Sequence, residues 1–230
     1  MYVILQVVLR DGGERYTETD LSRLIVEPWN GASALLFLGI VAFWAYKLRG
    51  QYRQHLFLSI NLPILAIGGI GGTLYHAFRM SAVFLMMDWL PIMILCFAAS
   101  VYFFIRVLDN WWLAALIVGL ALLSQVLMFR YQLLPMDLAV NVNYTVMGAL
   151  ILVPTVLLLW KTGFRGAQWI GYALASFVVA VSCRVLDHAE LLPMGTHFLW
   201  HVFGAAACTS MFQYVYELNR VPVSTPAPVI

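Results

Sequence analysis

The sequence carries little charge. Only 10% of its 230 residues are Asp, Glu, Lys or Arg, 63% are hydrophobic, and the mean hydropathy is +0.86. Because soluble domains are about one quarter charged, this composition excludes a soluble globular or disordered protein. The net charge of +2 comes without a basic tract, which argues against nucleic acid as a partner. The three cysteines all fall in apolar stretches, which argues against a disulfide framework and a paired-cysteine zinc site. These absences indicate an integral membrane protein.

Long apolar stretches dominate the rest of the chain. A membrane-spanning helix needs about 20 mostly apolar residues, and polar or Gly/Pro breaks divide the chain into seven such stretches. They are Gly31–Tyr46, Leu56–His76, Ser81–Ile105, Trp111–Phe129, Leu138–Trp160, Ala167–Val185 and Thr196–Tyr216. Their short connections predict an all-α membrane protein, a single seven-transmembrane helix bundle over residues 31–216. Residues 1–30 are predicted to form either an N-terminal cap, as a small hairpin, or a disordered or interfacial segment. Residues 217–230, with three prolines, are predicted to be a flexible tail.

Basic residues are distributed unevenly over the connections. Those on the C-terminal side hold seven, and those on the N-terminal side hold three outside the N-terminal segment. The positive-inside rule therefore predicts a multi-pass protein with a cytoplasmic C-terminus. A retinal protein is excluded because the only lysines, Lys47 and Lys161, lie at span ends or in loops. The pattern implies no particular oligomeric state.

Ionisable residues in or beside the spans gather at one end of the predicted bundle. They are Glu27, His76, Asp88, Arg184, Asp187, His197 and His201. Such groups are costly in a membrane and usually face a partner, a cavity or a site, so their convergence predicts a functional site. His188 lies in a loop at this end as a reserve ligand, whereas His55 lies in a basic loop at the other end and is expected to be solvated.

The histidines have the spacing of metal ligands. His197 and His201 are four residues apart, so a helix would project both from one side. With His76 as the third ligand, they could hold one zinc ion and leave an open position for water, as catalytic zinc sites do. The alternative is that each histidine hydrogen-bonds a neighbouring helix or lies in the headgroup region.

Asp88 could act as a general base on zinc-activated water or orient a histidine ligand. The alternative is that Arg79 or Arg184 neutralises it. Arg184 and Asp187 are three residues apart and are expected to pair with each other, close to the site. Thr73 could donate a hydrogen bond to a developing oxyanion, or to its own helix carbonyl.

Four glycines precede His76 in the second predicted span, namely Gly68, Gly69, Gly71 and Gly72. They lack the strand–turn–helix context of a nucleotide-binding loop. They are expected to permit close helix approach, or to leave room for an acyl chain.

Three sequence patches carry a resemblance to a known group of membrane proteins. They are Glu27-Pro28-Trp29-Asn30-Gly31-Ala32-Ser33, Gly72-Thr73-Leu74-Tyr75-His76 with Asp88-Trp89-Leu90-Pro91, and His197-Phe198-Leu199-Trp200-His201. In this order, on seven spans, they resemble the superfamily of alkaline ceramidases, progestin and adiponectin-type receptors and glycosylphosphatidylinositol-remodelling hydrolases. The ceramidase-like branch is the most similar. One departure is Gly72, where that family usually has serine.

The resemblance implies a zinc-dependent intramembrane hydrolase of sphingolipid metabolism. It implies zinc held by His76, His197 and His201, with Asp88 acting on the zinc-activated water that cleaves a lipid amide such as ceramide. It also implies a possible calcium site, for which Glu27, Asn30 and Asp20 are the candidates here. The alternatives are a hydrolase of ester lipids and a lipid receptor or sensor in which zinc is structural.

Overall fold

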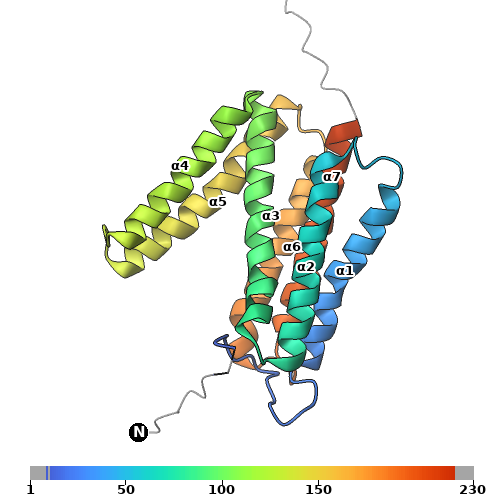
Figure 1. Cartoon of the computed structure of the whole chain (residues 1–230), viewed down its shortest axis with the longest axis vertical. Coiled ribbons are helices and arrows are strands. Elements are labelled where there is room, and N and C mark those ends of the chain that lie inside the picture. The colour runs from blue at the N-terminus through green and yellow to red at the C-terminus, as the bar shows by residue number, and fades with distance from the viewer. Residues whose placement is uncertain (1–8, 10, 221–230) are drawn as a thin grey trace, which may run out of the picture. The chain divides into compact units, whose positions relative to one another are not determined.

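The computed structural model describes residue 9 and residues 11–220 (Figure 1). In this part of the chain there are seven α-helices, one short 3-10 helix and no strand. The α-helices are α1 (Pro28–Lys47), α2 (Leu56–Phe78), α3 (Ala82–Leu108), α4 (Trp111–Arg130), α5 (Met136–Lys161), α6 (Ala167–Val185) and α7 (His197–Arg220), and the 3-10 helix is η1 (Leu186–Ala189). The all-helical prediction is confirmed.

The helix ends differ from the predicted ones by a few residues. α1 begins at Pro28, a residue favoured in a first turn, so Glu27 precedes the helix rather than lying inside it. α7 continues to Arg220, four residues beyond the predicted end. The predicted tail after Arg220 and the apolar residues 1–8 lie outside the described residues. We call residue 9 and residues 11–26 the leader; they form turns and bends. The first strand of the hairpin that the sequence allowed would fall in residues 1–8, outside the described residues.

Five segments of the described chain are long and apolar enough to cross a membrane. They are α1, α2, α3, α4 and the segment Ala167–Ala189 that contains α6. α5 contributes a shorter apolar stretch, Thr145–Lys161. The composition is therefore that of a membrane protein. α7 is more polar because it carries two of the candidate ligand histidines, together with Gln213 and Glu217.

The chain divides into two compact units, whereas the sequence predicts one bundle. Within the described residues, unit 1 comprises residues up to 92 and residues 168–220, and unit 2 comprises residues 93–167. In unit 1, α1 packs along α2 and α7 (Figure 1). The predicted close approach at the glycine row is confirmed. A Cβ atom on Gly69 would lie 2.9 Å from Leu38 of α1, and one on Gly71 would overlap Met87 of α3.

Unit 2 has its own core. Phe104 of α3, Ala114 and Val118 of α4 and Leu150 of α5 form its buried centre. α4 and α5 run antiparallel beside one another (Figure 1). The ammonium group of Lys161 lies 3.0 Å from two backbone carbonyl oxygens in the last turn of α3 and thereby caps that helix.

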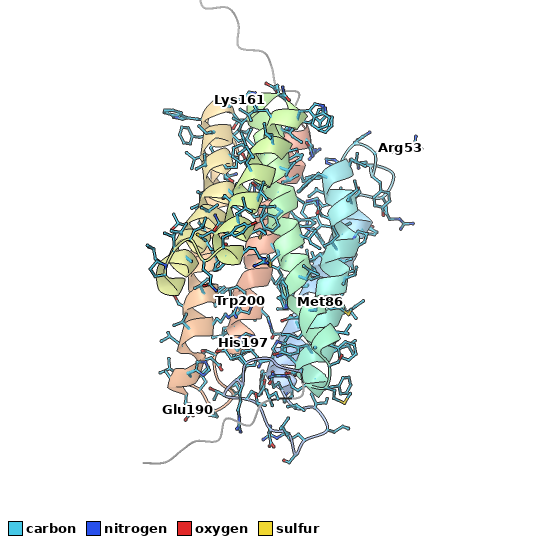
Figure 2. The ribbon with its side chains drawn as sticks, turned by 60° about the vertical axis from the view of Figure 1, so that its left-hand side comes forward. Arg53, Met86, Lys161, Glu190, His197 and Trp200 are labelled. Carbon is cyan, nitrogen blue, oxygen red and sulfur yellow. The ribbon has the colours of Figure 1, made fainter. Side chains whose placement is uncertain are left out.

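The two ends of unit 1 have different chemistry. Figure 2 shows His197 at the same end as Glu190, and Arg53 at the opposite end. Near the Arg53 end, the Nζ atom of Lys47 lies 4.4 Å from the ring centroids of both Trp44 and Tyr216. His55 stacks on Tyr216 with ring centroids 4.6 Å apart and is 2% exposed, so the prediction of a solvated histidine is wrong.

Candidate metal centre

The N-terminus of α7 is fixed by one buried carboxylate. Oδ1 of Asp187, in η1, accepts hydrogen bonds from the backbone N–H groups of Thr196 and His197 at 2.7 and 2.8 Å. Its Oδ2 accepts the backbone N–H of Thr17 in the leader at 2.9 Å. A carboxylate is favourable here because the first turn of a helix has unpaired N–H groups and a positive dipole end. Asp187 therefore sets the position of His197.

Three histidines from two distant helices meet at this end of unit 1. His76 comes from the last turns of α2, and His197 and His201 come from the first turns of α7. Their ring centroids lie 4.9 to 5.2 Å apart, and one candidate ligand atom from each lies within 4.8 Å of the others. They are 0%, 3% and 3% exposed. The predicted convergence of these three residues is thus confirmed.

Hydrogen bonds behind two of the rings leave the opposite nitrogens free to bind a metal. Nδ1 of His76 lies 2.5 Å from Oε2 of Glu27. Nδ1 of His201 lies 2.8 Å from the Ser33 hydroxyl and 3.1 Å from the backbone carbonyl oxygen of Asn30. These partners accept a hydrogen bond from Nδ1–H, so the other ring nitrogen, Nε2, keeps its lone pair. Metal sites use the same arrangement, in which a second hydrogen bond orients the ligand.

Glu27 is the centre of a buried hydrogen-bond network. Besides His76, it accepts hydrogen bonds from the Thr19 hydroxyl at 2.6 Å and from the guanidinium of Arg79. Burial alone would raise the pKa of Glu27, but the hydrogen bond from His76 and the charge of Arg79 outweigh burial and hold the pKa below its usual range. Glu27 is therefore a carboxylate, and it fixes the orientation of His76.

Unpaired atoms and buried charge both indicate that a cation fits this site. In the described residues, Nε2 of His76 and Nδ1 of His197 are buried without a hydrogen-bond partner, which costs free energy unless a ligand satisfies them. The buried charged side chains of the described chain are four carboxylates (Asp11, Glu18, Glu27 and Asp187) and one guanidinium (Arg79). A divalent cation at the three histidines would offset this excess of negative charge.

Asp88 lies against α2 one turn from the histidine ligand. A Cβ atom on Gly72, four residues before His76, would lie only 2.5 Å from Oδ1 of Asp88. The carboxylate thus takes the space that a side chain at position 72 would need. This contact accounts for a glycine at position 72.

The predicted role of Thr73 finds no support in its geometry. Its hydroxyl donates a hydrogen bond of 2.7 Å to the carbonyl oxygen of Gly69 in its own helix. The hydroxyl hydrogen is therefore occupied by the backbone, which is the alternative that the sequence left open.

The expected pair of Arg184 and Asp187 is wrong. No ion pair joins them in the described part of the chain, because the Asp187 carboxylate accepts backbone N–H groups instead. The guanidinium of Arg184 lies 5.4 Å from the ring centroid of Trp200. His188, the reserve ligand, lies at the surface 2.8 Å from a carboxylate oxygen of Glu14 and does not join the three histidines.

The carboxylates proposed for calcium have other partners. Both Oε atoms of Glu27 face His76, Thr19 and Arg79. Asp20 accepts hydrogen bonds from Ser22 and pairs with Arg23 at 2.9 Å. The structure brings Asn30 to Glu27, with 3.3 Å between Nδ2 and Oε2, but it does not bring Asp20 to either.

The leader supplies contacts that sequence reasoning missed. The ring of Tyr16 stacks on His197 at 3.9 Å between centroids and lies 5.4 Å from His76. Burial raises the pKa of Tyr16 well above its usual range, and the charge of Asp88 adds to this effect. Glu18 caps α1 by accepting the backbone N–H groups of Trp29 and Asn30. The one signal in the sequence was the density of acidic and hydroxyl residues in a segment too polar to span.

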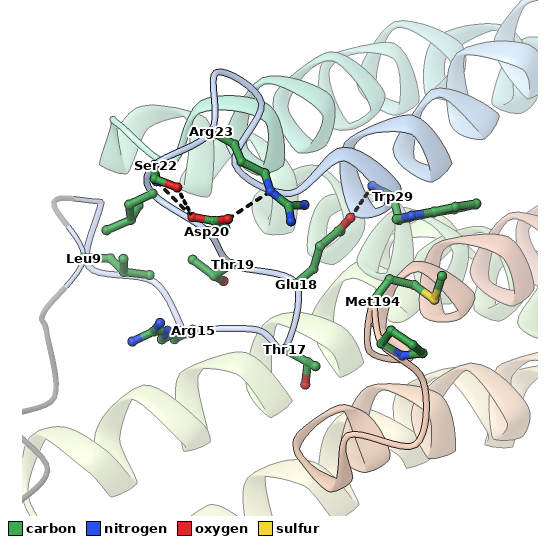
Figure 3. Close-up of a pocket in the computed structure, with 12 residues that line it drawn as sticks. Leu9, Arg15, Thr17, Glu18, Thr19, Asp20, Ser22, Arg23, Trp29 and Met194 are labelled. Carbon is green, nitrogen blue, oxygen red and sulfur yellow. Dashed lines mark hydrogen bonds and ion pairs between the residues drawn. The ribbon is translucent and has the colours of Figure 1, made fainter.

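A pocket of about 780 Å³ opens on the leader (Figure 3). Its lining includes Arg15, Arg23, Trp29 and Met194, together with Glu18. Figure 3 shows Asp20 hydrogen-bonded to Ser22 and paired with Arg23 at this pocket. The pocket thus combines charged groups with an aromatic and an apolar side chain.

In comparisons with known proteins, no family model, no curated protein and no solved structure matches this chain. We therefore infer the function from the geometry of the site itself.

Proposed function

We propose that this chain is a seven-span integral membrane protein with a cytoplasmic C-terminus, and that unit 1 is a zinc-dependent lipid hydrolase. The observation that carries the proposal is the buried histidine triad. His76 and His201 are each oriented through Nδ1, and buried nitrogens of His76 and His197 lack any partner in the described chain. Three imidazoles are a donor set that suits zinc and leaves a position open for water.

α7 counts as the seventh span in this proposal although it is the most polar helix. Its polar side chains would face the site and the other helices of unit 1 rather than lipid, as is typical of ionisable groups within membrane segments. Two of them, His197 and His201, are buried in this way. The basic residues of the connections favour the cytoplasmic side for its C-terminal end.

A zinc ion held by three histidines supplies Lewis acidity and lowers the pKa of water to about 7. The residues of the chain orient the ligands and transfer the proton. His76 and His201 present their Nε2 atoms, held by Glu27 and by Ser33 with Asn30. Asp88, one turn away across Gly72, accepts the proton of the attacking water and returns it to the leaving amine.

The substrate class that we propose is a lipid amide of the ceramide kind. A site at the end of apolar helices suits a molecule whose acyl chain stays in the bilayer while its polar head faces water. The leader pocket, with Arg15 and Arg23, offers the head group polar contacts at this end. An ester lipid would fit the same arrangement. Cleavage of an amide rather than an ester is therefore a separate part of the proposal.

The test is hydrolysis of defined lipids by the purified, zinc-loaded protein in detergent. Ceramide-like amides and matched ester lipids are offered, and release of fatty acid is measured by mass spectrometry. Asp88→Asn should lower kcat at least about 100-fold, since a general base contributes that much or more. The matched control is Asp109→Asn, which removes an exposed partner of Lys161 in unit 2.

Three outcomes separate the candidate functions. Amide cleavage that depends on Asp88 supports the proposal, and ester cleavage alone redirects it to ester lipids. A zinc-loaded protein that cleaves neither class contradicts a hydrolase and favours a receptor or sensor in which the metal is structural.

A further inference from the structure

Arg79 occupies an unusual position at the end of α2. It is the residue that ends the helix, with φ 50° and ψ 38°, in the left-handed region. Glycine is the residue that helices most often place there, because a Cβ atom makes this conformation costly. Four other non-glycine residues of the described chain also have a positive φ, so the side-chain contacts of Arg79 are what distinguish it.

The guanidinium of Arg79 binds three oxygen groups from two parts of the chain. Nε and Nη2 donate to the two carboxylate oxygens of Asp11 at 2.7 and 3.2 Å, and Nη2 also donates to the backbone carbonyl oxygen of Glu14 at 2.8 Å. Nη1 donates to Oε1 of Glu27. The side chains of Arg79, Asp11 and Glu27 are all 0% exposed. The forked, charge-assisted contacts to Asp11 are the strong kind of hydrogen bond.

These contacts connect the leader to a metal ligand. The path runs from Asp11 through Arg79 to Oε1 of Glu27, and from Oε2 of Glu27 to Nδ1 of His76 at 2.5 Å. Arg79 therefore holds the carboxylate that orients His76 and, with the same group, holds the segment that carries Tyr16 over His197.

We propose that Arg79 is a positioning residue of the metal centre, which fixes Glu27 behind His76 and docks the leader over the histidines. The inference rests on the metal centre of the proposed function, but not on hydrolysis. A lysine could keep the charge but not the fork that reaches Asp11 and Glu27 together. A merely structural arginine would support folding without affecting metal affinity in the folded protein.

The experiment measures the zinc affinity of the purified full-length protein by competition with a chromophoric chelator. Changes in residues behind a ligand typically weaken metal binding about 10- to 100-fold. We expect a loss in this range for Arg79→Gln, with partial recovery in Arg79→Lys. Asp11→Asn should cause a smaller loss, because it removes only the leader side of the network. The matched control is Arg53→Gln, an exposed arginine at the opposite end of unit 1 (Figure 2); it should stay within about twofold of the wild type.

Folding is monitored on the same samples by far-ultraviolet circular dichroism and by size-exclusion profile. Wild-type zinc affinity in a folded Arg79→Gln protein overturns the proposal. If Arg79→Gln does not fold, Asp11→Asn decides: a folded protein with unchanged zinc affinity overturns the proposal, and a weakened affinity supports it. A wild type that binds zinc but cleaves no lipid would contradict the proposed hydrolase function. The test of Arg79 would still be valid, because it measures only zinc affinity.

Discussion

Gly72 faces the carboxylate of Asp88 so closely that a Cβ atom on residue 72 would lie 2.5 Å from Oδ1. Asp88 is the proposed general base, and Gly72 lies one turn before the ligand His76. The carboxylate of Asp88 can therefore occupy this position only because residue 72 has no side chain.

Adding a side chain at residue 72 should displace Asp88. We expect Gly72→Ser to lower kcat about 100-fold, because a misplacement of about 1 Å can cost that much, while zinc content stays unchanged. Gly39→Ala in α1 is the matched control, since a Cβ atom there meets nothing within 4 Å. Full activity of Gly72→Ser would contradict the role of Asp88.

Ser33 should contribute to metal affinity through His201. Its hydroxyl lies 2.8 Å from Nδ1 of His201, so Ser33→Ala removes one of two acceptors that orient the ring. Since the carbonyl oxygen of Asn30 remains, we expect a loss in zinc affinity near the lower end of the range, about 10-fold. Ser182→Ala, which removes a hydroxyl bonded to its own helix, should change nothing. Equal affinities in the two variants would show that the Ser33 hydroxyl does not orient the ligand.

His55 should make the protein less stable in mild acid. Burial lowers its pKa below the ordinary value of about 6.5, and the charges of Arg220 and Lys47 lower it further. The unfolded chain therefore binds a proton below about pH 6.5 that the folded chain does not. The free energy of unfolding should fall as the pH drops from about 6.5 toward the lowered pKa, by at most about 1.4 kcal/mol per pH unit.

Denaturation midpoints at pH 7.5 and pH 5.5 measure this effect. The wild type should lose more stability between the two than His55→Gln does. His188→Gln, which removes a surface histidine beside Glu14, should keep the wild-type dependence. Because the metal ligands are common to all three proteins, the difference isolates His55. Identical losses in the wild type and His55→Gln would refute the prediction.

Chelators should distinguish zinc from calcium. The carboxylate oxygens of Glu27 face His76, Thr19 and Arg79, and those of Asp20 face Ser22 and Arg23. A calcium-selective chelator should therefore leave the melting temperature unchanged, whereas a zinc-selective chelator should lower it by several degrees, since metal loss removes binding free energy from the folded state. A clear loss of stability with the calcium chelator would restore the calcium hypothesis.

The helices could be predicted because apolar length is itself the property that a membrane span requires. The predicted bounds of α6 agree with the structure, and those of the other helices differ by a few residues. The triad could be predicted because His197 and His201 share a helix face and His76 ends a span at the same level.

The contacts of the leader could not be predicted in the same way. Tyr16 and Asp11 lie in irregular backbone. Their contacts at the site are with residues 60 to 181 positions away, so no local sequence pattern predicts these contacts. The pair expected from the spacing of Arg184 and Asp187 failed for a related reason. Asp187 instead caps α7, which begins ten residues later. The chain returns to Asp187 through the turn at Gly195.

The most direct test of the account is the zinc content of the purified protein, measured by elemental mass spectrometry after exposure to zinc and desalting. We predict one zinc ion per chain in the wild type and in His188→Ala, and loss of that ion in His76→Ala, His197→Ala and His201→Ala. A wild type without zinc, or a His201→Ala protein that keeps the full equivalent, would contradict the metal centre.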